Sequence, residues 1–473
     1  MLFNSLTFAL FFVVTYGLYI GVRHRLQNVL LLFASYVFYG FWDWRFLGLI
    51  IGSTVVDYFC GLAIQGGREK RRRRVFLLVS VCTNLGLLGF FKYAGFFSES
   101  FRALALGLGW EVDAFTLNVV LPVGISFYTF QTMSYTIDIY RGTMKPTRSF
   151  LNFAVFVAFF PQLVAGPIER ASNLLKQVEL PRRVSETAFQ RGLWLIFFGL
   201  FKKVFIADNL APMVDRAFAP GTDLSGAEIL VAVYAFAFQI YGDFSGYSDI
   251  ARGISRLMGF EIMLNFRMPY FTRNVQEFWH RWHISLSSWL RDYLYISLGG
   301  GRCAPWRVYA NLMITMTLGG LWHGAAWTFV VWGIYQGTLL AAHRFLRPVF
   351  QAAGHLFRRV NRLWELCSII VTFQFVCLGW LIFRAGSVTQ IMDFLRKIIF
   401  DFGDLSAVTH DLQRLAFFAA PLLLIQVAKE VSGDMHIVER LHWWAKGPVY
   451  LILAVLLVTA GASGGRTFIY FQF

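Results

Sequence analysis

The sequence predicts an all-α, polytopic integral membrane protein, and three observations lead to this fold class. The chain is 57% hydrophobic and only 15% charged, whereas soluble domains average about 45–50% apolar and about 25% charged residues. The apolar residues gather in blocks close to or above the roughly 20 residues that cross a bilayer as a helix. The basic residues gather between these blocks. A soluble fold could not hide this much apolar surface.

The apolar blocks predict about 11 spanning helices, together with re-entrant and tilted ones, at about 20 residues for each span. The clearest blocks are residues 5–22, 75–91, 193–200 with its flanks, 308–342, 368–383 and 448–460. No long hydrophilic stretch remains to form a second domain. We therefore expect a single integral-membrane domain over residues 1–473.

The N-terminal segment is expected to remain as the first span. It has no basic residue before its apolar run and no small-residue cleavage site after it, so it does not resemble a cleavable signal peptide. Basic clusters follow the first span at 23–25 and the third at 68–74, while the turn between them carries only Arg45. An excess of Lys and Arg marks the cytoplasmic side. This pattern puts the N-terminus outside.

The net charge of +16 has a second interpretation, because basic runs also bind nucleic acid. The basic runs of this chain lie next to apolar blocks, so the topological interpretation is favoured. Membrane lipid is therefore an expected partner and nucleic acid is not.

Two apolar segments are interrupted by residues that break helices. Residues 121–141 contain Pro122 and Gly124, and residues 156–170 contain Pro161, Gly166 and Pro167. Interrupted backbone at membrane depth survives only where it is buried in protein or lines a watery cavity. We expect both segments to be re-entrant pieces around an internal cavity.

Residues 241–301 form the most polar and aromatic stretch of the chain. A helix that begins at about Asn274 places one set of residues on a single face. This set is Trp279, Trp282, Leu286, Trp289 and Tyr293, with His280, His283 and Ser287 on the neighbouring face. Such an amphipathic helix either lies on the membrane surface or plugs the protein interior. Arginines outnumber acidic residues between 246 and 307, which favours the cytoplasmic side.

His323 is the only histidine in residues 308–342. This run of 35 residues contains no Asp, Glu, Lys or Arg. If this run forms one helix, His323 lies roughly 20 Å from either end, close to the membrane midplane. An ionisable residue at that depth is a functional hypothesis by default. Burial disfavours the imidazolium form, and a neutral imidazole is what a general base needs. A neutral histidine that only links helices by hydrogen bonds is an equally weighted alternative.

His280 and His283 invite a metal hypothesis because they are three residues apart. No third ligand stands at a typical spacing, and HEXXH is absent. A polar site facing the cytosol, with Glu277, Arg281 and Ser287 nearby, is favoured over a metal site. A surface helix at the lipid interface remains an alternative for each of these residues.

Two further kinds of site are not supported. The five cysteines are odd in number and lack paired spacing, so neither a disulfide framework nor a zinc cluster is predicted. Asp243, Ser245, Ser248 and Asp249 lie close together in sequence, but no GxSxG elbow is present. An all-helical chain also lacks the α/β sheet of a serine hydrolase.

Five longer motifs resemble the membrane-bound O-acyltransferase family, specifically its bacterial branch typified by alginate O-acetyltransferases. They are PVGISFYTFQTMSYTIDIYR (122–141), FFPQLVAGPIER (159–170), FWHRWHISLSSWLRDYLY (278–295), GLWHGAAW (320–327) and FIYFQF (468–473). The resemblance implies that His323 is the catalytic histidine and that His283 is the second characteristic position, on the cytoplasmic side of a tunnel. It also implies a ring of spanning helices around shorter tilted ones. His280 has no such counterpart.

The resemblance implies an enzyme, an O-acyltransferase that acts on a secreted polysaccharide such as alginate. An acyl group, expected to be acetyl, would come from acetyl-CoA or another cytoplasmic thioester and pass across the bacterial inner membrane to a periplasmic acetyltransferase partner. His323 would deprotonate a hydroxyl while another residue stabilises the oxyanion. From the residues themselves, we infer that the arginine-rich stretch attracts the phosphates of the donor.

Two functions of other classes compete with this one. Interrupted helices and buried polar residues are equally typical of a transporter or flippase subunit of an exopolysaccharide export system. Transporters usually have two related halves, however, and the interruptions near Pro122 and Pro161 have no evident counterpart in the C-terminal half. A purely structural subunit of the secretion complex is the third alternative.

Overall fold

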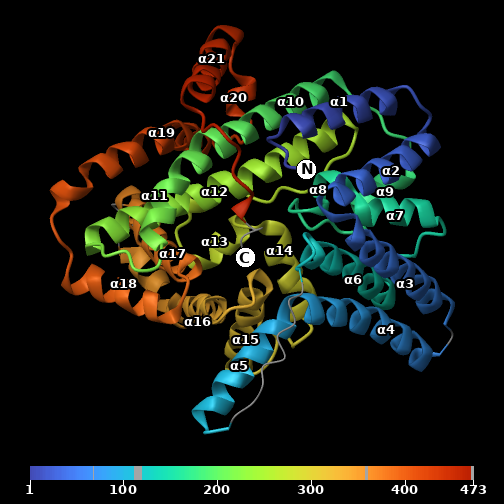
Figure 1. Cartoon of the computed structure of the whole chain (residues 1–473), viewed down its shortest axis with the longest axis horizontal. Helices are drawn as coiled ribbons and strands as arrows, with labels where there is room; N and C mark the ends of the chain where they lie inside the picture. Colours follow the sequence, from blue (N-terminus) through green and yellow to red (C-terminus); the bar gives the residue numbers. More distant parts are fainter. Residues whose placement is uncertain (68, 111–119, 357–360, 470–473) are drawn as a thin grey trace. The chain divides into compact units, whose positions relative to one another are not determined.

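The computed structural model describes residues 1–67, 69–110, 120–356 and 361–469, and it contains no β-strand within these ranges. Most of the described residues are helical, which confirms the all-α prediction (Figure 1). The chain divides into two compact units, Met1–Leu193 with Ala251–Met263, and Trp194–Ile250 with Leu264–Phe473.

The first unit contains the helices of the N-terminal part of the chain. They are α1 (Leu6–Ile20), α2 (His24–Asp43), η1 (Trp44–Phe46), α3 (Leu47–Gly66), α4 (Lys70–Leu88), η2 (Gly89–Tyr93), α5 (Ala94–Gly107), α6 (Ile125–Arg141), α7 (Phe150–Ala158), α8 (Phe160–Leu163), α9 (Leu174–Glu179) and the start of α10 (Glu186–Leu200). The two basic clusters expected from the sequence lie at the starts of α2 and α4. Arg23 directly precedes α2, which begins with His24 and Arg25, and residues 70–74 form the first turn of α4.

Helices α3, α4 and α6 pack closely in this unit, and the packing depends on small and polar residues. A Cβ at Gly61 of α3 would lie 2.7 Å from the ring of Tyr135 on α6, so only glycine allows this approach. Asp57 is fully buried between the helices and accepts hydrogen bonds from Ser80 and Asn84 of α4. A buried carboxyl group that is hydrogen-bonded in this way links two helices in an apolar interior.

The two interrupted segments are buried in protein, as the sequence predicts. Helix α7 has nine residues, and the chain bends at Phe159 before the four residues of α8. Both helices are too short to span a bilayer. The residues around this bend, from Phe153 to Phe160, are buried completely. Gly124 directly precedes α6 and has a φ of +77°, and a Cβ there would lie 2.6 Å from the carbonyl oxygen of Leu163.

The second unit contains the end of α10 and the remaining helices. They are η3 (Phe201–Ala207), α11 (Asp208–Phe218), α12 (Gly226–Leu257), η4 (Pro269–Phe271), α13 (Val275–Arg281), α14 (Ile284–Trp289), η5 (Leu290–Tyr295), α15 (Pro305–His323), α16 (Trp327–Leu356), α17 (Asn361–Arg384), α18 (Val388–Phe400), η7 (Leu405–Val408), α19 (Thr409–Ser432), α20 (Ile437–Arg440) and α21 (Trp443–Ala460). The final residue of α12 that belongs to this unit is Ile250.

Helix α12 has 32 residues and carries two buried ion pairs. Lys203 of η3 lies 2.9 Å from both Asp208 and Asp243, and Lys202 lies 2.7 Å from Asp249. Charged groups are costly to bury unless they are paired. The acidic residues that the sequence places beside Ser245 therefore form ion pairs that attach η3 and α11 to α12.

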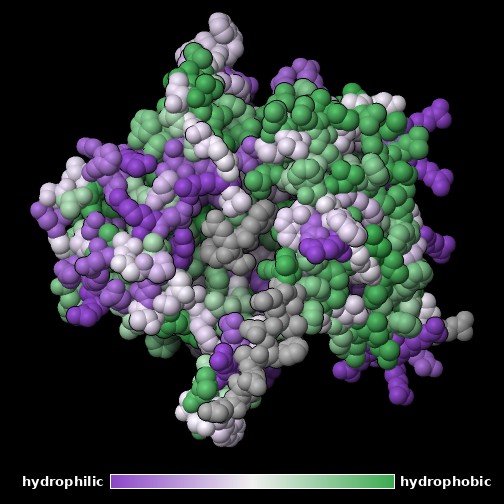
Figure 2. All heavy atoms as spheres, in the orientation of Figure 1, coloured by the Kyte–Doolittle hydropathy of each residue, from purple (hydrophilic) through white to green (hydrophobic). Residues whose placement is uncertain are grey.

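The side chains on the outside of several helices are those of a protein embedded in lipid. Leu10, Val13 and Val14 of α1 are each more than 60% exposed, and Figure 2 shows hydrophobic residues over much of the visible face of the first unit. Within the described residues, six helical stretches are long and apolar enough to cross a membrane. The chain is therefore a multi-pass membrane protein, and the predicted count of about 11 spans is not confirmed.

Candidate active site

His323 is the last residue of helix α15, at the turn of a helical hairpin formed by α15 and α16. After it, Gly324 adopts an extended conformation and α16 begins three residues later. Glycines bring the two helices close together. A Cβ at Gly320 would lie 2.2 Å from the carbonyl oxygen of Phe329, and one at Gly333 would lie 2.5 Å from that of Met316. No other residue type fits at these two positions.

The prediction of one continuous helix over residues 308–342 is therefore wrong. The run without formal charge contains two helices that pack against each other, with the turn directly after His323. The glycines beside His323 allow the two helices to pack closely. They also allow the turn that brings α16 back against α15. His323 consequently lies at the end of a 19-residue helix rather than in the middle of a longer one.

Aromatic rings surround His323. Its side chain is buried, and its ring centroid lies 5.1 Å from that of Trp322, 5.2 Å from that of Trp332 and 5.3 Å from that of Phe383. All three contacts are edge-to-face. Such packing restricts rotation of the imidazole and excludes water from most of its surface.

His283 lies at the start of the short helix α14, in the left-handed backbone region with a φ of +41°. This conformation is uncommon for residues other than glycine, and strained backbone of this kind clusters at functional sites. The side chain is completely buried against the ring of Phe244, at a centroid distance of 4.6 Å. Its ring centroid lies 6.4 Å from that of His323. The two histidines singled out in the sequence are therefore neighbours.

The predicted amphipathic helix from about Asn274 to Tyr293 is broken at this point. Helix α13 ends at Arg281, Trp282 is extended, and α14 begins only after His283. The pattern of the apolar face holds in part, because Trp282, Leu286 and Trp289 are buried. The continuous helix is wrong because His283 is left-handed, and an α-helix cannot continue through such a residue.

His283 lies outside the six candidate spans, and burial lowers its pKa to about 3. The imidazole is therefore neutral at pH 7. One of its nitrogens carries a proton and the other has a lone pair, so the side chain can donate one hydrogen bond and accept another.

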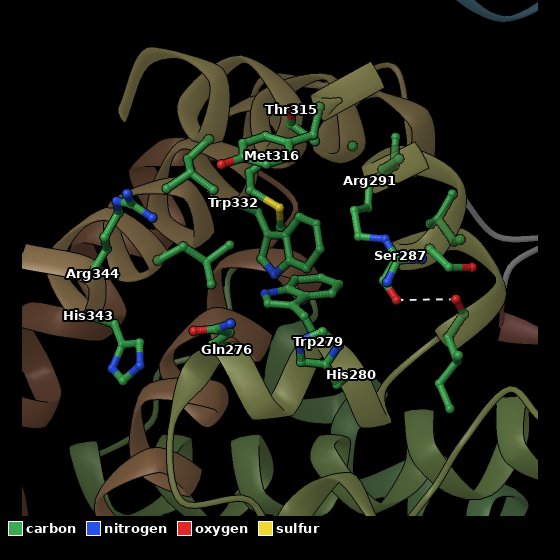
Figure 3. A pocket seen from close by; sticks show the side chains of 18 of the residues that line it. Gln276, Trp279, His280, Ser287, Arg291, Thr315, Met316, Trp332, His343 and Arg344 are labelled. Carbon is green, nitrogen blue, oxygen red and sulfur yellow. Dashed lines mark hydrogen bonds between the residues drawn. The ribbon is translucent and has the colours of Figure 1, made fainter. Parts of the chain in front are cut away.

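A cavity of about 320 Å³ lies between α13, α14, η5, α15 and α16, and His323 is part of its wall. Figure 3 shows the indole rings of Trp279 and Trp332 beside each other in the middle of this cavity, with a centroid separation of 5.9 Å. His343 and Arg344 lie on one side of these rings, and Ser287 and Arg291 on the other. Thr315, Ser287 and Ser288 also line the wall.

The rim of the cavity is basic. The lining includes the exposed side chains of His280, Arg291, Arg344 and Arg347, and the partly exposed His343. Partial burial and the positive charge of Arg347 lower the pKa of His343 below its ordinary value. A rim of this kind attracts phosphate or carboxylate groups, and arginine pairs with both.

Two tryptophans of the cavity wall have buried indole N–H groups. The Nε1 atoms of Trp279 and Trp332 are buried, and neither has a hydrogen-bond partner among the described residues. Buried indole N–H groups usually find a partner. A carbonyl oxygen of a substrate is a partner of the right kind, because an indole N–H can only donate.

Several residues that the sequence places near this site have other roles. Glu277 pairs with Arg281 at 2.6 Å, and Arg281 also pairs with Glu430 at 3.1 Å. Neither Glu277 nor Arg281 lines the cavity. His280 is exposed at the rim, apart from His283 in the interior. Within the described ranges, no three His, Cys, Asp or Glu side chains lie together in the way that a metal ion requires.

Sequence reasoning missed four residues of this site. Asn265 holds His283, Trp332 packs on His323, and Arg344 and Arg347 belong to the rim. The arginines could have been found, because they are the first formal charges after the run of 35 residues. Asn265 carries no comparable signal. Of the motif at 468–473, residues 470–473 lie outside the described residues, while Phe468 packs against Phe244.

Comparison with known proteins identifies the chemistry. The model of the membrane-bound O-acyltransferase family matches residues 145–385, about half of the chain. A protein of Azotobacter vinelandii named "probable alginate O-acetylase AlgI" is 44% identical over 437 residues, which cover 92% of this chain and 85% of that protein. The peptidoglycan O-acetyltransferase of Helicobacter pylori is 33% identical, with 94% of this chain and 91% of that protein covered.

A more distant relative is named for the transfer of a different acyl group. The teichoic acid D-alanyltransferase of Bacillus subtilis is 28% identical over 284 residues, which cover 56% of this chain and 69% of that protein. The matched family region contains both histidines and the whole of the cavity wall. The chain belongs to the membrane-bound O-acyltransferase family, and it is an O-acyltransferase related to alginate and peptidoglycan O-acetyltransferases.

Proposed function

We propose that this protein transfers an acetyl group from a cytoplasmic thioester, acetyl-CoA or another acyl thioester, across the bacterial inner membrane for O-acetylation of a secreted polysaccharide such as alginate. His323 and His283 are the catalytic residues of this proposal. One observation carries it: the two buried rings lie 6.4 Å apart, and His323 lines a cavity with a basic rim.

The chemistry assigned to the site is acyl transfer with general base catalysis. His323 accepts the proton of an incoming hydroxyl group as its oxygen attacks the thioester carbonyl carbon. The negative charge that develops on the carbonyl oxygen needs a donor, and the indole N–H of Trp332 lies on a ring that packs directly on His323. Collapse of the intermediate breaks the C–S bond, forms the ester and returns the proton to the thiolate.

The dimensions of α16 suit a donor with a phosphopantetheine arm. Arg344 and Arg347 follow Trp332 by 12 and 15 residues on one continuous helix, which corresponds to about 18 and 22 Å along its axis. An extended phosphopantetheine arm is about as long as four to five extended residues, roughly 15 Å. With a phosphate at Arg344, the thioester would therefore end about 3 Å short of Trp332 along the helix axis, and with a phosphate at Arg347 about 7 Å short.

The polysaccharide acceptor in this proposal is inferred from the names of the relatives. Alginate and peptidoglycan are outside the cytoplasm, whereas the arginines of the rim are of the kind that marks the cytoplasmic side. The acetyl group would then pass through the protein to a hydroxyl on the other side. A periplasmic acetyltransferase partner would complete the transfer to the polysaccharide.

Replacement of His323 by Gln tests the enzyme against the transporter or flippase subunit. Gln preserves much of the side-chain volume but cannot accept a proton at neutral pH. We expect normal membrane insertion and normal polymer export, with a loss of polymer acetate of about 10²–10⁴-fold, the usual contribution of general base catalysis. Native acetate content in this variant would refute the role of His323. Loss of polymer export together with acetate would favour a transporter.

The cytoplasmic origin of the donor has its own test. Proteoliposomes of one known orientation receive radiolabelled acetyl-CoA from one side only, and transfer to a hydroxyl acceptor enclosed on the other side is measured. We expect transfer only when the rim of Arg344 and Arg347 faces the donor. Equal transfer from both orientations would rule out a vectorial path.

A further inference from the structure

The contacts of Asn265 around His283 determine which way the side-chain amide of Asn265 is oriented. Its Oδ1 atom accepts hydrogen bonds from the backbone N–H of Ser285 at 3.3 Å and from the hydroxyl of Ser285 at 2.9 Å. A backbone N–H can only donate, so the atom that faces it must be the amide oxygen. On the other side, Nδ2 donates to the hydroxyl of Ser248 at 3.2 Å.

The same Oδ1 atom lies 3.1 Å from Nδ1 of His283. An amide oxygen is an acceptor only, and the Ser285 hydroxyl, 3.4 Å from the same nitrogen, already donates its single proton to Oδ1, so Nδ1 of His283 carries the proton. The proton-accepting nitrogen of the neutral ring is then Nε2. Asn265, His283 and Ser285 are all completely buried, so water does not compete for these hydrogen bonds.

Asn265 also holds the backbone next to His283. Its carbonyl oxygen accepts a hydrogen bond from the N–H of Ile284 at 2.9 Å. Together with the bond from the N–H of Ser285, this fixes two successive peptide groups directly after the left-handed residue. A strained conformation persists only where its surroundings determine it. Asn265 therefore secures both the position of His283 and the proton on its ring.

We infer that Asn265 is a positioning residue for acyl transfer: it holds His283 as the tautomer with a proton on Nδ1, so that Nε2 faces away from Asn265 as the only ring nitrogen able to accept a proton. This inference rests on the proposed function, because it gives His283 a role in the reaction. Groups that orient a metal-binding histidine contribute roughly 10- to 100-fold to activity, and we expect an effect of this size here.

The tautomer itself can be observed without an activity assay. In nitrogen NMR spectra of histidine-labelled full-length protein, the signals that disappear in His283→Gln belong to His283. We expect them to show a protonated Nδ1 and an unprotonated Nε2 in the native protein, and a mixture of tautomers in Asn265→Ala. A protonated Nε2 in the native protein would overturn the inference.

A double-mutant cycle tests whether Asn265 acts through His283. The acetate content of the exported polymer, divided by the amount of folded protein in the membrane, is measured for Asn265→Ala, His283→Gln and the combined variant. We expect a 10- to 100-fold loss for Asn265→Ala in the native background and no further loss in the His283→Gln background. Equal losses in both backgrounds would show that Asn265 does not act through His283.

Two more variants keep the outcome clear if Asn265→Ala folds poorly. Asn265→Asp retains an acceptor for Nδ1 and places a negative charge beside the ring, which should make Nε2 more basic and move the acid limb of the pH profile to higher pH. Asn209→Ala is the matched control, because Asn209 bonds three carbonyl groups of η3 and α21 in the same unit. It should affect the amount of folded protein but not the activity of that protein.

The outcomes separate this inference from the proposed function. If His283→Gln keeps native activity, the catalytic role of His283 fails and the inference fails with it. If His283→Gln loses activity while Asn265→Ala keeps native activity and Asn265→Asp keeps the native pH profile, only the inference is overturned.

Discussion

The two histidines of the site occupy surroundings that differ in almost every physical respect. His323 ends a regular helix in a charge-free run, and rings and close helix contacts at glycines surround it. His283 lies in the most polar part of the chain, in strained backbone held by hydrogen bonds to Asn265. Substitutions that add volume should therefore disrupt the surroundings of His323, and substitutions that remove hydrogen bonds should disrupt those of His283.

The largest effect is expected for Gly320→Val in the hairpin that carries His323. A Cβ at this position would lie 2.2 Å from the backbone oxygen of Phe329, which cannot move without separating α15 from α16. We expect almost no folded protein on size-exclusion chromatography of the detergent extract. Gly52→Val on α3 is the control, since a Cβ there meets nothing within 4 Å. A monodisperse, active Gly320→Val protein would contradict the packing described for the hairpin.

At His283, the backbone and the ring can be separated by choice of substitution. Asparagine tolerates the left-handed conformation, whereas a β-branched residue does not. We expect His283→Asn to fold normally but to lose about 10²–10⁴-fold of acetyl transfer, as for a missing acid–base group. His283→Val should in addition lose folded protein. Both are measured as polymer acetate per folded protein, and equal folding of the two variants would mean that the strain has no energetic effect.

The contrast also explains which parts of the site could be predicted from sequence. The helical class and the burial of the interrupted segments follow from composition and from the glycines and prolines within apolar runs. The two histidines were singled out through their family motifs, but their proximity was not predicted. The turn after His323 was not predicted, because glycines beside a histidine are equally compatible with a loosened helix.

The break in the helix at His283 could not be predicted from the spacing of the tryptophans around it. Trp279, Trp282, Leu286 and Trp289 continue a helical spacing across the break, although the chain at Trp282 is extended. The left-handed residue depends on hydrogen bonds to Asn265, which lies 18 residues earlier. Local spacing does not contain such a tertiary contact, so the helix pattern extended through a position that the fold interrupts.

A smaller effect, on stability rather than on chemistry, is expected for the tryptophan just before His283. Trp282 is almost completely buried and packs on Trp380 at 4.7 Å and Phe266 at 4.9 Å. Truncation of a buried aromatic side chain costs about 3–5 kcal/mol. We expect Trp282→Ala to lower the thermal midpoint markedly. Trp279→Ala, at the partly exposed cavity wall, should lower it less, and the reverse order would contradict the burial of this segment.

The smallest effect is expected at the basic rim, where neither packing nor strain is involved. Arg344 and Arg347 are exposed, and an exposed ion pair contributes about 0.2–1 kcal/mol, which is up to about five-fold in affinity. Replacing each by Gln should raise the KM for acetyl-CoA by up to this factor, leave kcat unchanged, and weaken the salt dependence of KM. Arg302→Gln is the matched control, because it removes the same charge from an exposed position that does not line the cavity. If Arg302→Gln raised KM as much as the rim variants, the effect would reflect net charge, and binding of the donor at Arg344 and Arg347 would have to be abandoned.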